Sequence, residues 1–509
     1  MKKARLKVDK DFTIDKVDKR IFSTFIEPAG NLVYGNIYDP EHPEADEQGF
    51  RKDVLKLMCE LNSTLIRYPG GNFVSDYHWM DGIGPKDKRP VRYEKAWKNI
   101  ESNQMGIDEY TDWVKKAGSQ PMLAVNLGTG TPEEASYEVE YTNMEGGTYF
   151  SDLRKKYGHE KPHNIKMWCL GNEMDGTWQI GEKTAEEYGR IAYEAAKEMR
   201  LVDPDIELVA CGSCANDKSH PSYPDWDRVV LEHCYENIDY LSLHRYYNYD
   251  PESVKGTPFP AQFTVEDLPC ISKDLTNFFD TICAAADFVK GRKYSDKTIN
   301  ICLDEWGVMS SQTVEVKGLD WSERTIPEKG HRFSNMNLID AVVFGSLLIT
   351  FINKCDRVKI TCQTFPIGSM IGVDPEEGVF RQTTFYPFKH AVTYAKGVAL
   401  RPALQSPLKE TDGYGKQPFI QTASVYDKET GFVTVFAVNL DLRERVEFDC
   451  NLQFDSVKLV QHIQLYDSQP LAVNTFKNQN RIIPKKISVS EKKVVLPPLS
   501  WNVLRYEVK

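Results

Sequence analysis

Eight short apolar runs, separated by amphipathic stretches, organise the first three-quarters of the chain. The runs are Ile21–Glu27, Thr64–Gly70, Pro121–Leu127, Asn164–Glu173, Ile206–Gly212, Tyr240–Tyr246, Thr298–Gly307 and Val358–Phe365. They are rich in β-branched residues and alternate poorly between apolar and polar positions, which is typical of parallel strands covered on both faces. We therefore expect eight parallel strands.

Helical signals fill the segments between these runs. Thr184 and Glu187 have the spacing of a capping box, and apolar residues follow them at helical spacing from Tyr188 to Met199. A second apolar stripe runs from Tyr110 to Ala117, with Gly118 placed to end that helix. Strands alternating with helices predict an α/β protein of the (β/α)8 TIM-barrel class. A doubly wound open sheet is less favoured, because no GxGxxG motif follows a strand.

The pattern changes after about residue 385. Alternation appears in several segments between Phe419 and Val460, and turn signals such as Asp412-Gly413 separate the strands. This pattern predicts an antiparallel, jelly-roll-like β-sandwich, to which the alternating N-terminal residues add a strand. We expect a catalytic barrel over residues 19–385 and a sandwich domain formed by residues 1–18 with 386–509.

Charge and cysteine content narrow the function classes. The chain has 509 residues, with 63 Lys and Arg against 74 Asp and Glu, and a formal charge of −11. An acidic surface is a poor partner for nucleic acid or for an anionic membrane, so we expect neither. Eleven scattered cysteines indicate a reducing compartment, and no apolar signal region follows the N-terminus, so we expect a cytoplasmic protein. The CxxC spacing of Cys211 and Cys214 lacks a second pair, which favours packing over metal or redox use.

Polar side chains recur where the apolar runs stop, at the barrel face that carries active sites. They are Glu27, Arg67 with Asn72, Asn126, Asn172 with Glu173, His244 with Tyr246, Asp304 with Glu305, and Gln363. Each has an ordinary structural interpretation: a helix cap for Glu173, a core histidine for His244, or a solvated loop pair at residues 304–305. Two carboxylates that face each other across a barrel mouth are, however, the catalytic groups that glycoside hydrolysis requires.

Longer motifs resemble the α-L-arabinofuranosidases of glycoside hydrolase family 51. They are Ile37–Asp46, Arg67–Phe73, Ala124–Thr129, Met167–Gly176 and Leu496–Asn502, and the resemblance covers essentially the whole chain. It implies a retaining exo-glycosidase that releases α-L-arabinofuranosyl residues from arabino- or arabinoxylo-oligosaccharides. It also implies a homo-oligomer, often a hexamer, and no cofactor or metal.

The resemblance also implies a role for each matching residue. Glu173 would be the general acid/base and Glu305 the nucleophile, about 5–5.5 Å apart. Glu27, Asn72 and Asn172 would bind the sugar hydroxyls, Arg67 would keep Glu305 ionised, His244 and Tyr246 would orient the carboxylates, Gln363 would complete the pocket, and Trp97 and Trp178 would form the wall and the aglycone side. We expect Glu173 to hold a proton in the free enzyme.

Three positions depart from the family pattern. Pro28 stands where the family commonly has His, Thr177 where it has Pro, and Gly307 where it has Asn. All three border the predicted pocket, so the leaving group and the sugar that the enzyme accepts stay open.

Other functions remain open at this point. The same site would suit another retaining glycosidase, such as a β-xylosidase, an endo-glucanase or a xylanase. A metal-dependent barrel isomerase would use Glu173, His244 and Glu305 as ligands. A carbohydrate-binding protein with an inactive site is less favoured, because both glutamates are present.

Overall fold

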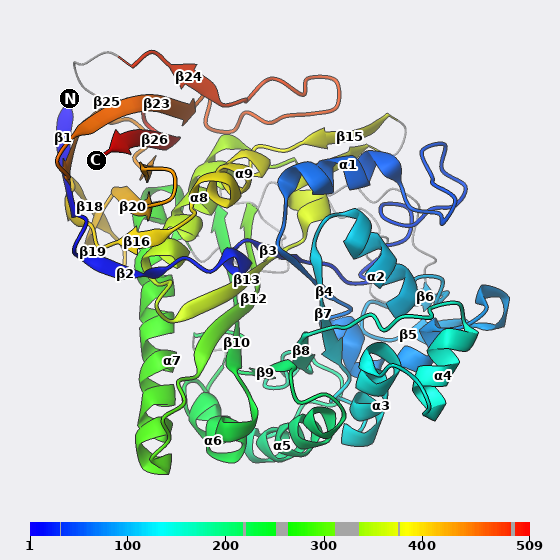
Figure 1. The fold of residues 1–509 in the computed structure, drawn as a ribbon. Coiled ribbons are helices and arrows are strands. Elements are labelled where there is room, and N and C mark those ends of the chain that lie inside the picture. Colours follow the sequence, from blue (N-terminus) through cyan, green and yellow to red (C-terminus); the bar gives the residue numbers. More distant parts are fainter. Residues whose placement is uncertain (31, 217–219, 251–262, 311–334, 375–376, 490–493) are drawn as a thin grey trace.

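The computed structural model describes residues 1–509 except 31, 217–219, 251–262, 311–334, 375–376 and 490–493. Eight of its strands form a closed parallel barrel (Figure 1). They are β3 (Ser23–Phe25), β4 (Leu65–Tyr68), β7 (Gln120–Val125), β8 (Met167–Leu170), β9 (Glu207–Cys211), β10 (Tyr240–Asp250), β12 (Asn300–Ser310) and β13 (Val358–Thr364). Parallel pairing of β13 with β3 and of β9 with β10 closes the cylinder. The predicted barrel is confirmed, and the open sheet is excluded.

Helices cover the outside of the barrel (Figure 1). They are α1 (Lys52–Leu61), α2 (Ile107–Lys116), α3 (Pro132–Asn143), α4 (Tyr149–Lys156), α5 (Ala185–Val202), α6 (Asp225–Cys234), α7 (Ile271–Lys293), α8 (Leu338–Asn353) and α9 (Phe385–Tyr394). Thr184 caps α5 through the predicted box with Glu187. Gly118 follows the end of α2 with a φ of +74°, a conformation that suits glycine.

Apolar side chains pack on both sides of the barrel strands, which explains their unbroken apolar runs. Residues such as Phe25, Met122 and Cys302 form one buried cluster, separate from the large cluster that includes Leu123 and Leu303. Because side chains alternate along a strand, neighbouring residues of one strand join different clusters. The barrel is therefore packed mainly by apolar side chains, with a few buried polar residues within the strands, such as Thr24 and Thr361.

The C-terminal part contains two sheets. A seven-stranded sheet has the order β2 (Thr13–Lys16), β16 (Val398–Leu400), β20 (Ile420–Asp427), β21 (Phe432–Asn439), β26 (Ser500–Val508), β23 (Val457–Leu465) and β24 (Lys485–Ile487). A four-stranded sheet has the order β17 (Ala403–Gln405), β1 (Lys2–Asp9), β22 (Val446–Gln453) and β25 (Val494–Leu496). The N-terminal residues add strands as predicted, although β1 runs parallel to β22.

Smaller strands lie outside these sheets. β5 (Arg92–Glu94) pairs with β6 (Asn99–Glu101), β14 (Ile371–Asp374) with β15 (Gly378–Arg381), and β18 (Leu408–Thr411) with β19 (Gly415–Pro418), while β11 (Phe263–Thr264) extends the barrel sheet beside β10. The division of the chain into residues 19–385 and 1–18 with 386–509 stays our proposal.

Helix α8 joins the barrel to the seven-stranded sheet. Fifteen of its residues, Leu338–Ile352, are buried, including the long apolar stretch of the sequence. Asn353 donates a hydrogen bond to the carbonyl oxygen of Thr422 at 2.9 Å, and Gly345 lies against the ring of Trp501. Among the described residues, no helix is both long enough and apolar enough to cross a bilayer.

Candidate active site

The barrel strands bring most of the predicted polar residues to one place. Arg67 lies in β4, His244 and Tyr246 in β10, Glu305 in β12 and Gln363 in β13. Glu27 follows β3, and Asn172 and Glu173 follow β8. Of these residues only Glu173 and Tyr246 are more than 9% exposed. Asp304 and Glu305 are both buried, so they are not a solvated pair. The helix that follows Glu173 is α5, which Thr184 caps, so Glu173 is not its cap.

Glu305 is held by two donors. Arg67 donates from Nη1 to Oε1 at 2.9 Å, and the Tyr246 hydroxyl donates to Oε2 at 2.7 Å. The same guanidinium donates from Nη2 to Asn172 Oδ1 at 2.7 Å. These bonds fix the direction in which the Glu305 carboxylate points.

Glu173 is held by two different donors. His244 Nδ1 lies 2.8 Å from Oε1, and Trp178 Nε1 donates to Oε2 at 2.7 Å. The backbone of Glu173 has a φ of +44°, which non-glycine residues rarely adopt and which is often found at functional sites.

The two carboxylates face each other closely. One oxygen of Glu173, one of Glu305 and a ring nitrogen of His244 all lie within 4.8 Å of one another. Retaining glycosidases keep their carboxyl groups about 5–5.5 Å apart, whereas inverting enzymes leave about 6.5–9.5 Å for a water molecule. The spacing therefore fits direct attack by a carboxylate on a sugar carbon.

Asp304 contacts residues on both sides of the site, although its sequence context predicted no catalytic or binding role for it. Its carboxylate lies 3.0 Å from Arg67 Nε and 3.3 Å from His244 Nε2, and it accepts a hydrogen bond from the Ser242 hydroxyl. Asp304 is only 1% exposed. The signal that pointed to it was its place beside Glu305 at the end of an apolar run.

The charges of these groups determine the proton positions. Burial raises the pKa of Asp304, but Arg67 and His244 outweigh burial and hold it below its usual range. Burial lowers the pKa of His244, but Glu305 and Asp304 outweigh it and raise that pKa well above its usual value. This direction favours the protonated form of His244, whose Nδ1 then faces Glu173 as a hydrogen-bond donor.

The two glutamates have pKa shifts opposite to our expectation. Burial and the charge of Glu173 raise the pKa of Glu305, despite the opposing effects of His244 and Arg67. Burial also raises the pKa of Glu173, but the hydrogen bond and charge of His244 outweigh burial and lower it. The reason is distance, because His244 Nδ1 lies 2.8 Å from Glu173 and 3.7 Å from Glu305. These directions favour a proton on His244 rather than on Glu173, where we expected it.

Glu27 and Trp97 meet on another side of the site. Glu27 Oε2 accepts from Trp97 Nε1 at 3.2 Å and from the backbone N–H of Phe73 at 3.3 Å. A Cβ at Gly71 would lie 2.0 Å from Glu27 Oε2, and the φ of Gly71 is +60°, so only glycine fits there. Burial, followed by the charge of Glu305, raises the pKa of Glu27 well above its usual value.

The remaining predicted residues are placed as follows. Asn172 keeps a buried Nδ2 group that no described residue accepts from, so a donor is available at the site. Gln363 donates from Nε2 to Ser369 Oγ at 2.7 Å, which ties its side chain to the loop after β13. Asn72 is partly exposed in the turn after β4, and Trp178 is 50% exposed. Asn126 bonds Thr129 in its own loop and also donates from Nδ2 to the carbonyl oxygen of Tyr77 at 3.1 Å.

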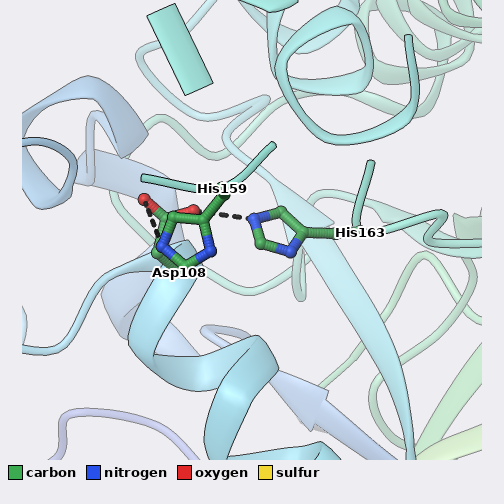
Figure 2. A group of neighbouring side chains, drawn as sticks. All are labelled: Asp108, His159 and His163. Atoms are coloured by element: carbon green, nitrogen blue, oxygen red, sulfur yellow. Dashed lines mark hydrogen bonds and ion pairs between the residues drawn. The ribbon is translucent and has the colours of Figure 1, made fainter. Parts of the chain in front are cut away.

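Three groups of side chains in the described part of the chain could hold a metal ion. One is the Glu173, His244 and Glu305 group of the site itself. Another is Asp108 with His159 and His163, shown in Figure 2. A third is Asp175 with Cys214 and His220.

In the second group, Asp108 already has good hydrogen bonds. Asp108 Oδ1 lies 2.7 Å from His163 Nε2, and Oδ2 accepts from the Tyr141 hydroxyl at 2.7 Å (Figure 2 shows the two histidines). His159 Nε2 lies 3.7 Å from the same carboxylate. These contacts connect the start of α2 to the segment after α4, which is a structural role.

Comparisons with known proteins give a consistent result. A model of the alpha-L-arabinofuranosidase 1 domain matches residues 57–253, and a model of the alpha-L-arabinofuranosidase C-terminal domain matches residues 304–500. An intracellular exo-alpha-(1→5)-L-arabinofuranosidase of Bacillus subtilis is 44% identical over 99% of both chains. An exo-alpha-(1→6)-L-arabinofuranosidase of Bifidobacterium longum is 40% identical over 99% of this chain and 97% of that protein.

A solved structure agrees with these matches. The family 51 alpha-L-arabinofuranosidase AbfB of Bifidobacterium longum superposes with a TM-score of 0.92 and 37% identity, covering 99% of this chain and all of that one. Both the barrel and the C-terminal sheets are therefore shared.

Proposed function

The chain belongs to the α-L-arabinofuranosidases of glycoside hydrolase family 51, and we propose that Glu305 is its nucleophile and Glu173 its acid/base. The protein is a retaining exo-glycosidase that releases terminal non-reducing α-L-arabinofuranosyl residues. The observation that supports the two roles best is the close approach of the carboxylates, within 4.8 Å. At this separation Glu305 can bond the anomeric carbon while Glu173 lies beside the glycosidic oxygen.

In the first step Glu305 attacks the anomeric carbon, and the bond to the leaving oxygen breaks. The leaving oxygen takes a proton from Glu173, and Glu173 is supplied with that proton by His244 across their 2.8 Å hydrogen bond. Arg67 and Tyr246 hold the attacking carboxylate in position. His244 is neutral once the glycosyl-enzyme has formed.

In the second step Glu173 takes a proton from water, and the oxygen of that water attacks the anomeric carbon. The bond to Glu305 breaks and restores its negative charge. The charge of Glu305 raises the pKa of His244 more than any other charge does. Once that charge is restored, His244 takes the proton back from Glu173. The resting charges are restored, and the sugar leaves with retained configuration.

Several other side chains bind the sugar in this proposal. Glu27 and the unpaired Nδ2 group of Asn172 bind ring hydroxyls, together with Asn72. Trp97 forms the wall beside Glu27. Trp178, half exposed and bonded to Glu173, lies on the aglycone side, and Gln363 supports the pocket through the loop after β13.

An arabinose-containing glycoside is the substrate. We propose that it is an arabino- or arabinoxylo-oligosaccharide, and that the enzyme forms a homo-oligomer, as the family resemblance implies. Relatives named intracellular, such as that of Bacillus subtilis, support the cytoplasmic location expected from the sequence.

The test compares wild type with Glu305→Ala and Glu305→Gln on 4-nitrophenyl α-L-arabinofuranoside. Loss of the nucleophile should lower kcat at least about 10⁴-fold, because no covalent intermediate can form. Added azide should restore some turnover in Glu305→Ala and give the β-azide, with inverted configuration. Glu138→Gln, at a buried glutamate of α3 that is 3% exposed, serves as the control and should keep its activity. Retained activity in both Glu305 variants, or hydrolysis of the β-xyloside instead, would contradict the proposal.

A further inference from the structure

Three side chains that could bind a metal, a thiol, an imidazole and a carboxylate, lie close together near Glu173. Asp175 follows β8, two residues after Glu173, while Cys214 and His220 lie in the loop between β9 and α6. One ligand atom from each lies within 4.8 Å of the others. Cys214 Sγ is 3.2 Å from His220 Nε2, and the Cys214 backbone N–H donates to Asp175 Oδ2 at 3.0 Å.

One carboxylate oxygen of this cluster has no hydrogen-bond donor in the described part of the chain. Asp175 Oδ1 is buried, and no described residue donates to it. An orphaned buried carboxylate oxygen is costly and calls for a partner. This distinguishes the cluster from Asp108 in Figure 2, where both carboxylate oxygens accept hydrogen bonds.

The donor atoms and their spacing suit zinc. Zinc in proteins takes sulfur, imidazole nitrogen and carboxylate oxygen, with bonds of about 2.3 Å to sulfur and about 2.0 Å to nitrogen. Two such ligands in a tetrahedron lie about 3.6 Å apart, so the observed contact of 3.2 Å between Cys214 Sγ and His220 Nε2 needs only a small opening. Cys214 and His220 are each 8% exposed, so water competes weakly.

We propose that Asp175, Cys214 and His220 form a binding site for Zn²⁺, with three protein ligands and an open fourth position. When the ion binds, the thiol proton passes to solvent and the sulfur bonds the metal as a thiolate. Cys211, the other half of the CxxC spacing, takes no part, because its thiol donates to the carbonyl oxygen of Leu170 at 3.5 Å.

The site is next to the catalytic machinery without being part of it. The His220 ring packs edge-on against Trp178, with ring centroids 5.4 Å apart, and Trp178 donates to Glu173. A bound ion would fix the His220 ring and hence one face of Trp178. The binding itself does not depend on the proposed role of Glu173.

The test uses the full-length, reduced enzyme and the metal alone. Titration calorimetry with Zn²⁺ should show one ion per chain, and Co²⁺ in its place should give a near-ultraviolet sulfur-to-metal charge-transfer band. Cys214→Ser and His220→Ala should each weaken Zn²⁺ binding at least about 100-fold, and Cys214→Ser should abolish the cobalt band. Zinc should also raise the Tm of wild type but not of Cys214→Ser.

Two control variants locate the binding. Cys59→Ser removes an exposed thiol, and His159→Ala disrupts the cluster of Figure 2; both should bind Zn²⁺ as wild type does. No binding at millimolar Zn²⁺, unchanged binding in Cys214→Ser, or loss of binding in His159→Ala would overturn the proposal. These readouts need no substrate, so they stay informative even if Glu173→Ala proves that the acid/base assignment is wrong.

Discussion

Replacing Glu173 with alanine separates its chemical role from its structural one. The change removes the acceptor of His244 Nδ1 and of Trp178 Nε1. His244 keeps two other carboxylates nearby, Asp304 at 3.3 Å and Glu305 at 3.7 Å, so the imidazolium stays paired. Alanine also carries a Cβ, so the backbone at φ +44° is strained no more than before. We therefore expect a folded enzyme.

The size of the effect should depend on the leaving group. General acid catalysis contributes about 10²–10⁴-fold, or about 3–5 kcal/mol of the barrier. An alkyl or sugar leaving group needs that whole contribution, because its alkoxide is a poor leaving group. A dinitrophenolate leaves without a proton, so kcat/KM for the dinitrophenyl arabinofuranoside should fall less than about tenfold. Its kcat should still fall, because the second step lacks its base.

Steady-state kinetics on these two substrates form the assay, with Glu173→Gln as a variant of similar shape. Azide should raise kcat for the dinitrophenyl substrate and give the α-azide, with retained configuration, because Glu305 still forms the glycosyl-enzyme. Equal losses of kcat/KM on both substrates would refute the assignment of Glu173 as the acid. An inverted azide product would show that Glu173 is the nucleophile.

Three further changes test the surroundings of the site. Asp304→Asn removes the charge that pairs two buried cations, so urea unfolding should show a loss of about 3–5 kcal/mol and kcat should drop; an unchanged midpoint would contradict that role. Burial raises the pKa of Asp227 to about 7. The unfolded carboxyl ionises near pH 4, so folding takes up a proton at Asp227 between about pH 4 and 7. Asp227 alone therefore makes the free energy of unfolding fall with rising pH by up to about 1.4 kcal/mol per unit. Asp227→Asn should flatten this slope, and an equally steep profile would count against it. A Cβ at Gly345 in α8 would lie 2.4 Å from Trp501, so Gly345→Ala should destabilise by about 1–3 kcal/mol. In contrast, Gly291→Ala meets nothing within 4 Å in α7 and should be neutral or stabilise by up to about 1 kcal/mol, and thermal melts of both compare them.

The sequence predicted the barrel because its signals are local. A parallel strand buried on both faces must be apolar throughout, so each of the eight strands appears as a run. The cap at Thr184 and the helix end at Gly118 follow from bonds within a few residues. The alternation after residue 385 matches the burial of β22, which has one buried and one more exposed face, whereas β20 and β21 are buried on both faces.

Long-range contacts explain what the sequence did not predict. Asp304 resembles an ordinary neighbour of Glu305 until folding places Arg67 and His244 around it. Cys214 was paired in the sequence with Cys211 by spacing, whereas its partners in space are His220 and Asp175. The parallel pairing of β1 with β22 depends on residues more than 400 positions apart.

The sequence by itself determined the family and the barrel, because family motifs and apolar strand runs consist of neighbouring residues. It also supplied the two glutamates that we propose as catalytic. Only the tertiary structure decided how the charges around the two glutamates are arranged. The His244 ring nitrogen is 2.8 Å from Glu173 but 3.7 Å from Glu305, so the histidine lowers the pKa of Glu173 while that of Glu305 is raised. Electrostatic interactions depend on distances of this kind, and the order of residues along a chain does not contain them.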